Sequence, residues 1–492
     1  MRDFGSIDIL VLVIFFFLNI MTVAVRERIR DFKEFASGRG NEYGGLSIVC
    51  TITALFCSAS LFWAGVEQVY LQGSFILWDY FIAEMLACLF AWYFYIPKLV
   101  SMDCYTLHEY MSWFYGNNIR RLFAISETCQ RIGRFAIQLC IIGKTFQIVW
   151  GLSLFHGNLV IIVFSILMAI YSSFGGLRAV TYTDVIQFFF FFVIIPTISL
   201  WIWHITDVET GGHECFKEVW NMPRMSFSGV FSTPESFIAA MAVFVRTVLV
   251  TPLNIPYFQR IQMCKTVGRA RKLWFFSTVC YGIIIAFVLF IGLQLLGVTK
   301  GIDPATGEEM KINGILPYML DHYSFPGMKM MFFVCIVSLA VSTSDSEFNG
   351  LATLYANDIA FFKNGQPLRT CKSANMFAWM AGSISLLLAL RFNDIFKLLM
   401  FVQNFFLPVA VVPTVATIFG LRTHKNCVWT GVICGVLATI IYSILARGTG
   451  YSQYSFGPGM LANAMGLFVS HIVWVANGGI WWKSSLKKSG EL

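Results

Sequence analysis

Long apolar runs, separated by short charged or Gly/Pro-rich segments, follow one another along the whole chain. Most of the runs reach the roughly 20 residues that a helix needs to cross a bilayer, and the short alternating segments typical of a β-barrel are absent. The pattern predicts an all-α polytopic membrane protein with about 13 transmembrane helices. The predicted spans are 8–25, 45–72, 77–97, 123–150, 157–174, 179–203, 234–258, 272–297, 327–361, 373–391, 394–421, 427–446 and 458–479.

The composition agrees with this pattern. Of the 492 residues, 57% are hydrophobic and 13% charged, and the mean hydropathy is +0.69, which is too apolar for a soluble domain of this length. The longest polar connections, 204–232 and 298–326, are predicted loops, so we expect no soluble catalytic domain and no enzyme. The first run lacks a small-residue cleavage site and is predicted to be a retained helix.

The basic residues predict an orientation. With the N-terminus outside, most of the 35 Lys and Arg residues fall on inside loops, as the positive-inside rule requires. The chain is therefore expected to be a multi-pass plasma (inner) membrane protein with its N-terminus outside and its C-terminus in the cytoplasm. The net charge of +8 reflects this topology, so no nucleic-acid partner is inferred. The 13 cysteines are scattered and are predicted to be small buried hydrophobes.

Several charged side chains interrupt the predicted spans. Each costs roughly 2.5–3.5 kcal/mol at the bilayer centre on insertion scales, so each is a candidate for function. A structural role is favoured for Lys144, Arg134 and Glu84. The side chain of Lys144 or Arg134 could snorkel to the membrane surface, or it could form a salt bridge with Glu84. The full set is Glu67, Glu84, Arg134, Lys144, Asp184, Arg246, Asp345 and Glu347.

The stretch AVSTSDSEFNG, residues 340–350, places a cluster of oxygens in an apolar run. On a helix Ser342, Asp345 and Ser346 stand at i, i+3 and i+4 and share one face, with Thr343 about 100° away. Hydroxyls and carboxylates of this kind suit a small hard cation. The alternative is that the hydroxyls bond to the preceding turn or to a neighbouring helix. The cluster with its carboxylate favours an ion site.

Two of the predicted spans carry signs of a break. The second contains CSASLFWAGVEQ, with polar residues in the middle of an apolar run, and the seventh contains Pro252 and Pro256. Interrupted helices at matching places in two halves of a chain are typical of secondary transporters, which bind substrate and ions at the breaks.

Three motifs resemble one family. They are YSSFGGLRAVTYTDVIQ at 171–187, VSTSDSEFNGLATLYANDI at 341–359 and FQRIQMCKTVGRARK at 258–272, and together they are similar to the sodium/solute symporter family of sodium-coupled proline, sugar, pantothenate and sialic acid transporters. The resemblance implies two inverted five-helix repeats of the leucine-transporter type, at 41–205 and 234–421. An extra helix and loop would precede them at 1–40, an extracellular loop would join them at 206–233, and two helices with a basic tail would follow at 422–492.

The resemblance also implies sodium as the coupling ion and positions for it. In the main site, the hydroxyls of Ser342 and Thr343 would join the backbone carbonyls of Leu61, Ala64 and Leu339. A second sodium site, present in some members, is matched by Asp184, Ser342, Asp345 and Ser346. A carboxylic acid at Asp345 or Glu347 could carry a proton instead, so proton coupling stays open.

Substrate contacts are expected at the breaks and on the helices that face them. By resemblance, Gln68 and, more loosely, Gln403 match positions that contact polar substrates, and Glu67 adjoins the first of them. Arg134, Gln138 and Arg246 could hold a carboxylate, because the planar guanidinium binds one bidentately. An equal alternative is that the arginines pair with Glu67, Glu84 or Glu347. The first expectation is thus an amino acid or other carboxylate such as proline, followed by a sugar.

Two other functions remain open on the sequence. The same fold occurs fused to histidine kinases, so a sensory module working with a separate kinase is one, although only a short basic tail is expected after residue 479. A membrane enzyme using Asp184, Asp345 and His108 is the other, but His108 falls on a predicted cytoplasmic loop. The small-molecule substrate and the lipid bilayer are the expected partners.

Overall fold

The computed structural model describes residues 9–11, 13–14, 31–37, 43–210, 214–304, 307–311, 313–362, 365–392, 394–448 and 451–479. Within them the chain is helical, apart from two isolated β-bridges. Ten described helices are long and apolar enough to cross a membrane, or 11 when one bent pair counts as a span, and 154–170 forms a shorter apolar helix. The predicted spans from 45 onward all fall on helices, whereas most of the first span and the basic tail lie outside the described residues.

The bounds of the helices that the following description uses most come first. They are α3 (Gly45–Phe56), α4 (Ala59–Gln72), α6 (Glu84–Phe90), α9 (Asn117–Trp150), α10 (Leu154–Thr210), α13 (Pro234–Val250), α14 (Ile255–Gln262), α15 (Val267–Thr299), α17 (Met328–Leu354), α18 (Cys371–Arg391), α19 (Ile395–Phe406), α20 (Val412–Ile418), α21 (Lys425–Leu445) and α22 (Phe456–Ala476). The remaining α-helices are α2 (Phe32–Ser37), α5 (Ser74–Ile76), α7 (Ile96–Leu99), α8 (Leu107–Tyr115), α11 (Glu214–Val219), α12 (Phe227–Val230) and α16 (Ile315–His322).

The span that contains α6 is not a regular α-helix. Two π-helical segments, η1 (Leu77–Ala83) and η2 (Ala91–Tyr95), flank α6 and join it to α5 and α7. Two more π-helical segments are described: η5 (Tyr355–Ile359) follows α17, and η6 (Leu407–Val411) joins α19 to α20 around Pro408. Such wide turns shift the side chains after them by a fraction of a turn and are frequent at functional sites.

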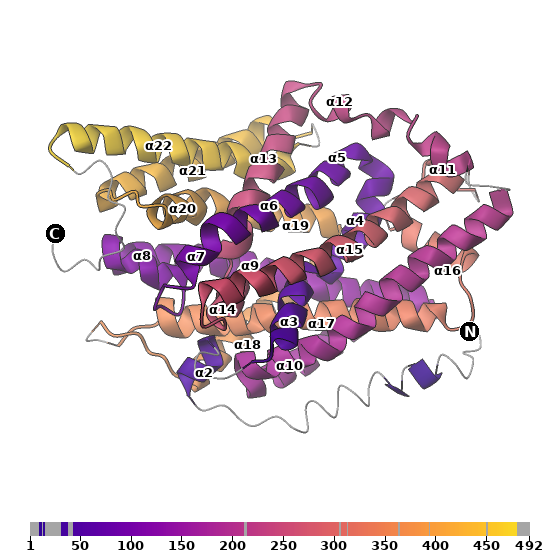
Figure 1. Ribbon diagram of the computed structural model, residues 1–492, viewed down its shortest axis with the longest axis horizontal. Coiled ribbons are helices and arrows are strands. Elements are labelled where there is room, and N and C mark those ends of the chain that lie inside the picture. Colours follow the sequence, from indigo (N-terminus) through magenta and orange to yellow (C-terminus); the bar gives the residue numbers. More distant parts are fainter. Residues whose placement is uncertain are drawn as a thin grey trace.

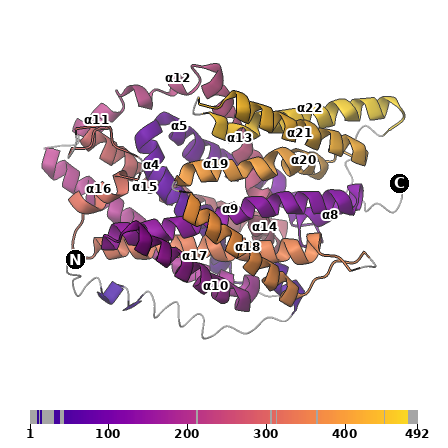
Figure 2. The same ribbon diagram turned by 180° about the vertical axis from the view of Figure 1, so that it is seen from behind.

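Helix α17 is the centre of the bundle. It packs against α9 and α10 along much of its length, and 83% of its most apolar window is buried, against 28% for α21 and for α22. Figures 1 and 2 show α21 and α22 together along one edge of the molecule, away from α17. The oxygen-rich stretch of the sequence therefore lies in the protein interior, and the last two helices form the periphery.

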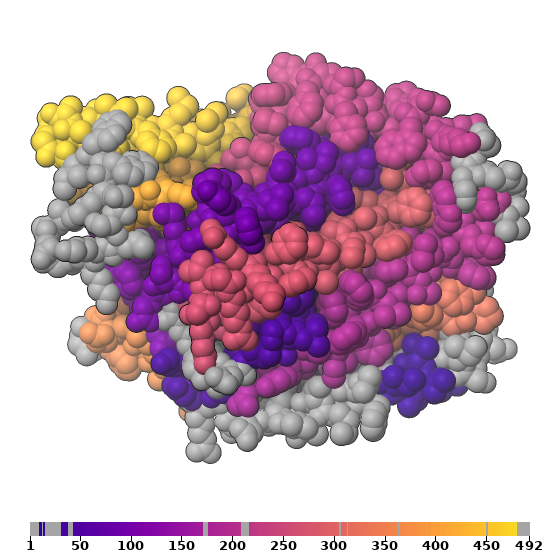
Figure 3. All heavy atoms as spheres, viewed as in Figure 1, coloured from indigo at the N-terminus to yellow at the C-terminus, as the bar shows by residue number. Residues whose placement is uncertain are grey.

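Two glycines allow helices to bend or approach closely. Gly176 has φ 50° and ψ −160°, a left-handed conformation that favours glycine, and it bends α10 where the sequence predicts a gap between spans 157–174 and 179–203. Gly292 lets α15 contact α4, because a Cβ at this position would lie 2.6 Å from the Val66 carbonyl oxygen. Figure 3 shows α15 crossing the middle of one face of the molecule.

Candidate functional site

The second predicted span is broken into α3 and α4, which meet at an angle of 46°. Ser58 begins the new helix: its hydroxyl accepts a hydrogen bond from the Leu61 backbone N–H at 3.1 Å, and its Oγ lies 2.8 Å from Ser60 Oγ. A helix end leaves its last carbonyls without an intrahelical partner. At the end of α3, near Phe56 and Cys57, carbonyls without an intrahelical partner are therefore expected.

The second break separates α13 from α14 at Thr251–Leu253, which form a single 3₁₀ turn. It coincides with the predicted Pro252 and Pro256. The backbone N–H of Ile255, the first residue of α14, donates to Glu127 Oε1 at 3.3 Å. A carboxylate at this place satisfies an N–H that the break leaves without a helical partner and suits the positive end of the helix dipole.

The residues predicted for the main sodium site are brought together only in part. On α17 the Thr343 hydroxyl donates to the Leu339 carbonyl at 2.9 Å, so these two oxygens are adjacent. Leu61 and Ala64, in contrast, lie inside α4, where a regular helix engages their carbonyls. The break occurs about one turn earlier than the predicted ligands, because the Ser58 cap, rather than a proline, starts α4.

The second predicted ion site contains a cation of the protein itself. Asp184 is fully buried on α10; its Oδ1 accepts from Ser342 Oγ at 2.6 Å, and its Oδ2 accepts from the Thr51 hydroxyl. Arg260 of α14, with none of its side chain exposed, lies with Nη2 3.5 Å from Asp184 Oδ2 and donates from Nη2 to Ser346 Oγ at 2.8 Å.

Arg260 follows the predicted span 234–258 and was not among the predicted site residues, yet the structure buries it on α14. The FQR motif at 258–260 was a signal for it, but its partners come from three other helices. Asp345, the fourth member of the predicted ion site, is also fully buried on α17.

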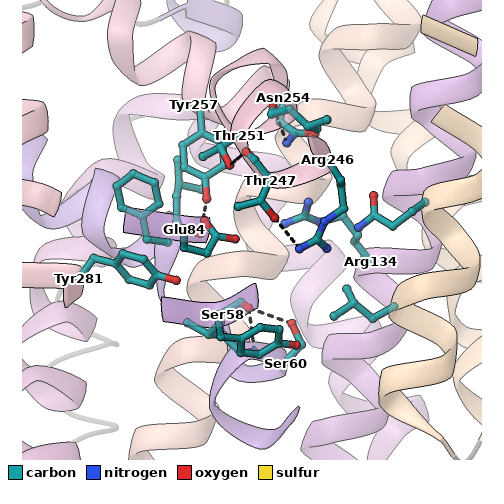
Figure 4. Close-up of a pocket in the computed structure, with 17 residues that line it drawn as sticks. Ser58, Ser60, Glu84, Arg134, Arg246, Thr247, Thr251, Asn254, Tyr257 and Tyr281 are labelled. Carbon is teal, nitrogen blue, oxygen red and sulfur yellow. Dashed lines mark hydrogen bonds between the residues drawn. The ribbon is translucent and has the colours of Figure 1, made fainter. Parts of the chain in front are cut away.

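A small polar cavity lies beside the two breaks (Figure 4). Its volume is about 110 Å³, large enough for water or a small solute group. Residues from α3, α4, α13, α14, α15, α19 and the α6 and α9 spans contribute to its wall. The wall is formed by Leu55, Phe56, Ser58, Ser60, Leu61, Tyr80, Glu84, Arg134, Arg246, Thr247, Val250, Thr251, Asn254, Tyr257, Tyr281, Leu399 and Gln403.

Three of the six predicted substrate residues line this cavity, and three do not. Arg134, Arg246 and Gln403 are part of the wall. Gln68 instead accepts from Gln72 at 2.5 Å, and Glu67 accepts from the Asn313 backbone N–H at 2.9 Å. Gln138 is buried on α9 about one turn beyond Arg134, outside the wall. In this structure the side chains of Gln68 and Glu67, both on α4, are engaged by these neighbours and do not line the cavity.

Arg134 belongs to a buried chain of alternating charges. Its Nε lies 3.0 Å from Glu347 Oε1, and Glu347 Oε2 accepts from Arg131 Nη1 at 2.7 Å. Arg131 also bonds to Glu127, whose Oε2 is 2.6 Å from His108 Nε2. We call these five residues the α9 relay; it runs from the cavity to the first N–H of α14. The sequence singled out Arg134 and Glu347 but not Arg131 or Glu127.

The other arginine of the cavity is also paired. Arg246 Nη2 lies 3.0 Å from Asp79 Oδ1, a buried aspartate in the third predicted span, and donates to Thr247 at 2.8 Å. Asp79 was missed, although a carboxylate within FILWDYFIAEM was a visible signal. The expected alternative of arginine ion pairs is thus confirmed, with Asp79 in place of Glu67 or Glu84 as the partner of Arg246.

The expected pairing of Glu84 with Lys144 or Arg134 is wrong. Arg134 pairs with Glu347, and the Lys144 ammonium donates to the Asn313 side chain. Glu84 lines the cavity instead. His108, the third residue of the enzyme alternative, is buried on α8 and pairs with Glu127 of the α9 relay rather than standing on an open loop.

Tyr257 connects the two broken helices. Its hydroxyl donates to the Leu55 carbonyl at 2.9 Å and thereby holds α14 against the end of α3. We expect Tyr257→Phe to lower the free energy of unfolding by about 1 kcal/mol, the usual net worth of a buried hydrogen bond. Tyr80→Phe is the matched control, since the buried Tyr80 hydroxyl has no hydrogen-bond partner among the described residues and its loss should be neutral. Equal melting temperatures of the two purified variants would contradict the role of the Leu55 contact.

The geometry defines a class of protein. A helical membrane bundle with two broken helices that meet beside a buried polar cavity is the architecture of a secondary transporter. The chain belongs to the sodium:solute symporter family, whose profile matches residues 35–435. This confirms the resemblance drawn from the motifs and the all-α membrane fold, and the family is one of symporters.

Relatives in the family differ in what they carry. Mouse sodium-coupled monocarboxylate transporter 1 is 23% identical over 72% of this chain and 57% of its own length. Human sodium-coupled monocarboxylate transporter 2 is 24% identical over 78% of this chain and 62% of its own length. Human high affinity choline transporter 1 is 24% identical over 65% of this chain and 55% of its own length. The chain thus spans about three fifths of the curated relatives that it matches.

Solved structures agree on the fold. A Na⁺-coupled sialic acid symporter in a substrate-bound outward-open state superposes with a TM-score of 0.74 at 20% identity, covering 98% of this chain and all of the other. MhsT in complex with L-phenylalanine gives a TM-score of 0.56 at 12% identity, covering 88% and 99%. The inverted-repeat, leucine-transporter-type fold is therefore shown.

Proposed function

We propose that this protein is a sodium-coupled symporter that imports a small organic solute by alternating access. One observation carries the proposal: a polar cavity lies where the broken pairs α3–α4 and α13–α14 meet, next to an arginine whose side chain is 23% exposed. This is Arg134, the charged group of the wall that a solute carboxylate can reach. Family membership supports the coupling to sodium.

Sodium is proposed to bind between the end of α3 and the middle of α17. Thr343 and Leu339 supply adjacent oxygens there, and Ser342 supplies a third on the neighbouring position. Carbonyls at the end of α3 are better placed as further ligands than those of Leu61 and Ala64, because they lack helical partners. A cation held by both helices would favour the state in which they stay together, which is how binding can drive a conformational equilibrium.

A second sodium at Asp184, Ser342, Asp345 and Ser346 remains a prediction. Arg260 already neutralises Asp184 and bonds to Ser346. A second ion would therefore have to bind when Arg260 has moved away. We accordingly propose one sodium ion as the coupling ion of the state described here.

The transported solute is proposed to carry a carboxylate group. An amino acid is therefore the first choice of substrate, and a sugar is the second. Arg134 Nε pairs with Glu347 at 3.0 Å, and an arginine can present its remaining N–H groups to a second carboxylate. The monocarboxylate relatives support this choice. The repeat boundaries 41–205 and 234–421 and the N-out, C-in orientation in the plasma membrane are proposed on the sequence pattern described above.

The test is uptake into proteoliposomes that contain the purified protein. Labelled amino acids, monocarboxylates and sugars are offered under an inward NaCl gradient or an equal KCl gradient, with protein-free vesicles as the control. Uptake that needs sodium and rises with an inside-negative potential supports the proposal, because the potential is worth about 2.3 kcal/mol per charge per 100 mV. Equal uptake in KCl, or uptake driven by a pH gradient alone, would refute sodium coupling and favour protons.

A further inference from the structure

Glu84 is the one acidic side chain in the described wall of the cavity. It begins α6, directly after the π-helical segment η1, and Figure 4 shows it reaching the cavity opposite Arg134. Among the described residues it makes no hydrogen bond and no ion pair, since both arginines of the wall have other partners. A carboxylate that is partly buried inside a membrane bundle without a partner is costly, and such groups are rare unless they serve a ligand.

A count of the charges around the cavity shows that the charge of Glu84 is not balanced. Arg246 is balanced by Asp79 at 3.0 Å. In the α9 relay two arginines face two glutamates, so the relay is neutral apart from its histidine. The described wall and its partners therefore carry one surplus negative charge, at Glu84. A solute with a carboxylate and no positive group would add a second negative charge to this cavity.

The surroundings of Glu84 are suited to a positively charged nitrogen. Tyr80, Tyr257, Tyr281 and Phe56 also line the cavity, and Phe56 packs against Tyr257 and Tyr281 with ring centroids 5.3 and 5.1 Å apart. Aromatic faces attract cations, including fully methylated ammonium groups. The hydroxyls of the wall, for example that of Thr251, can accept hydrogen bonds from an ammonium that still carries protons.

We propose that Glu84 binds the cationic nitrogen of the transported solute while Arg134 binds its carboxylate. The solute class is then a small zwitterion, an α-amino acid or its N-methylated form, rather than a plain monocarboxylate or a plain amine. The proposal rests on the proposed function and narrows it. It assigns Glu84 as the residue that determines specificity, because this side chain is the acidic group of the described wall and a zwitterion differs from a monocarboxylate of the same size by its positive charge.

The experiment measures binding to the purified protein in NaCl by the shift in melting temperature and by ligand titration. The probes are the twenty amino acids, N,N,N-trimethylglycine, propionate, choline and D-glucose. Wild type is expected to bind at least one zwitterion about tenfold or more tightly than propionate and choline, the usual worth of a charge-assisted contact. The amino acids and trimethylglycine separate a protonated from a methylated nitrogen.

Glu84→Gln is then expected to lose this preference and to keep the stabilisation by NaCl over KCl. Glu235→Gln, an exposed glutamate at the start of α13, is the matched control and should retain the preference. If propionate, choline or glucose bound wild type as tightly as every zwitterion, or if the preference survived in Glu84→Gln, the proposal would be overturned. If the wild-type melting temperature were the same in NaCl and KCl, sodium coupling would be refuted. The order of the affinities of wild type and Glu84→Gln for the probes would then still test the role of Glu84.

Discussion

Arg131→Met should lower the free energy of unfolding by about 3–5 kcal/mol, the usual cost of removing one partner from a buried ion pair. Arg131 is the centre of the α9 relay: it contacts both Glu127 and Glu347, and all three side chains are buried. Methionine fills a similar volume but leaves two carboxylates without their shared cation. Thermal and denaturant unfolding of the purified variant in detergent would measure the loss.

Arg178→Met is the matched control for this prediction. Arg178 pairs with Glu34 at 3.5 Å on the surface, with 44% of its side chain exposed, and exposed pairs contribute about 0–1 kcal/mol. Arg131→Lys is expected to recover part of the loss, because an ammonium keeps the charge but lacks the fork that contacts two carboxylates. If Arg131→Met and Arg178→Met had the same melting temperature, the α9 relay would have no structural role.

Thr343→Val should abolish the stabilisation of the protein by sodium over potassium. The substitution keeps shape and burial but removes the oxygen that lies beside the Leu339 carbonyl. Loss of one contact to a charged group weakens binding by about 1.5–3 kcal/mol, or about 10- to 100-fold. The measurement is the melting temperature in NaCl and KCl at equal ionic strength, followed by a sodium titration of the melting temperature.

Thr145→Val controls for loss of the hydroxyl alone. Thr145 is fully buried on α9 and makes the same bond to the preceding turn, to the Ile141 carbonyl at 2.8 Å. It should keep the sodium-specific shift. Ser342→Ala, like Thr343→Val, is expected to lose the sodium-specific shift in melting temperature. The same measurement on Asp184→Asn tests for a second sodium ion. If Thr343→Val kept the full sodium-specific shift in melting temperature, the assignment of the sodium site to α17 would be refuted.

Much of the fold could be predicted because hydropathy and helix length decide it. The runs from 45 onward all became helices, and Pro252 and Pro256 marked the break between α13 and α14. The break in span 45–72 was expected near its polar residues, but its position was not visible. No proline marks it, and the serine that caps α4 is one of several polar residues in that stretch.

The candidate site was less predictable, because charge partners in the bundle are far apart in the sequence. Arg246 and Asp79 are 167 positions apart, and Arg131 and Glu347 are 216 apart. A sequence shows that a charge is costly in a span but not which helix face meets it. Gln68 and Glu67 illustrate the same limit, since a rotation of α4 decides whether they face the cavity or its neighbours.

The buried pair of Arg260 and Asp184 has a consequence for water. Arg260 belongs to α14 and Asp184 to α10, so any movement that parts these helices separates two buried opposite charges and leaves each with neutral hydrogen-bond partners. Separated charges need hydration, and the alternative is a penalty of several kcal/mol per ion. Separation of α10 and α14 should therefore be accompanied by the entry of water at this end of the bundle.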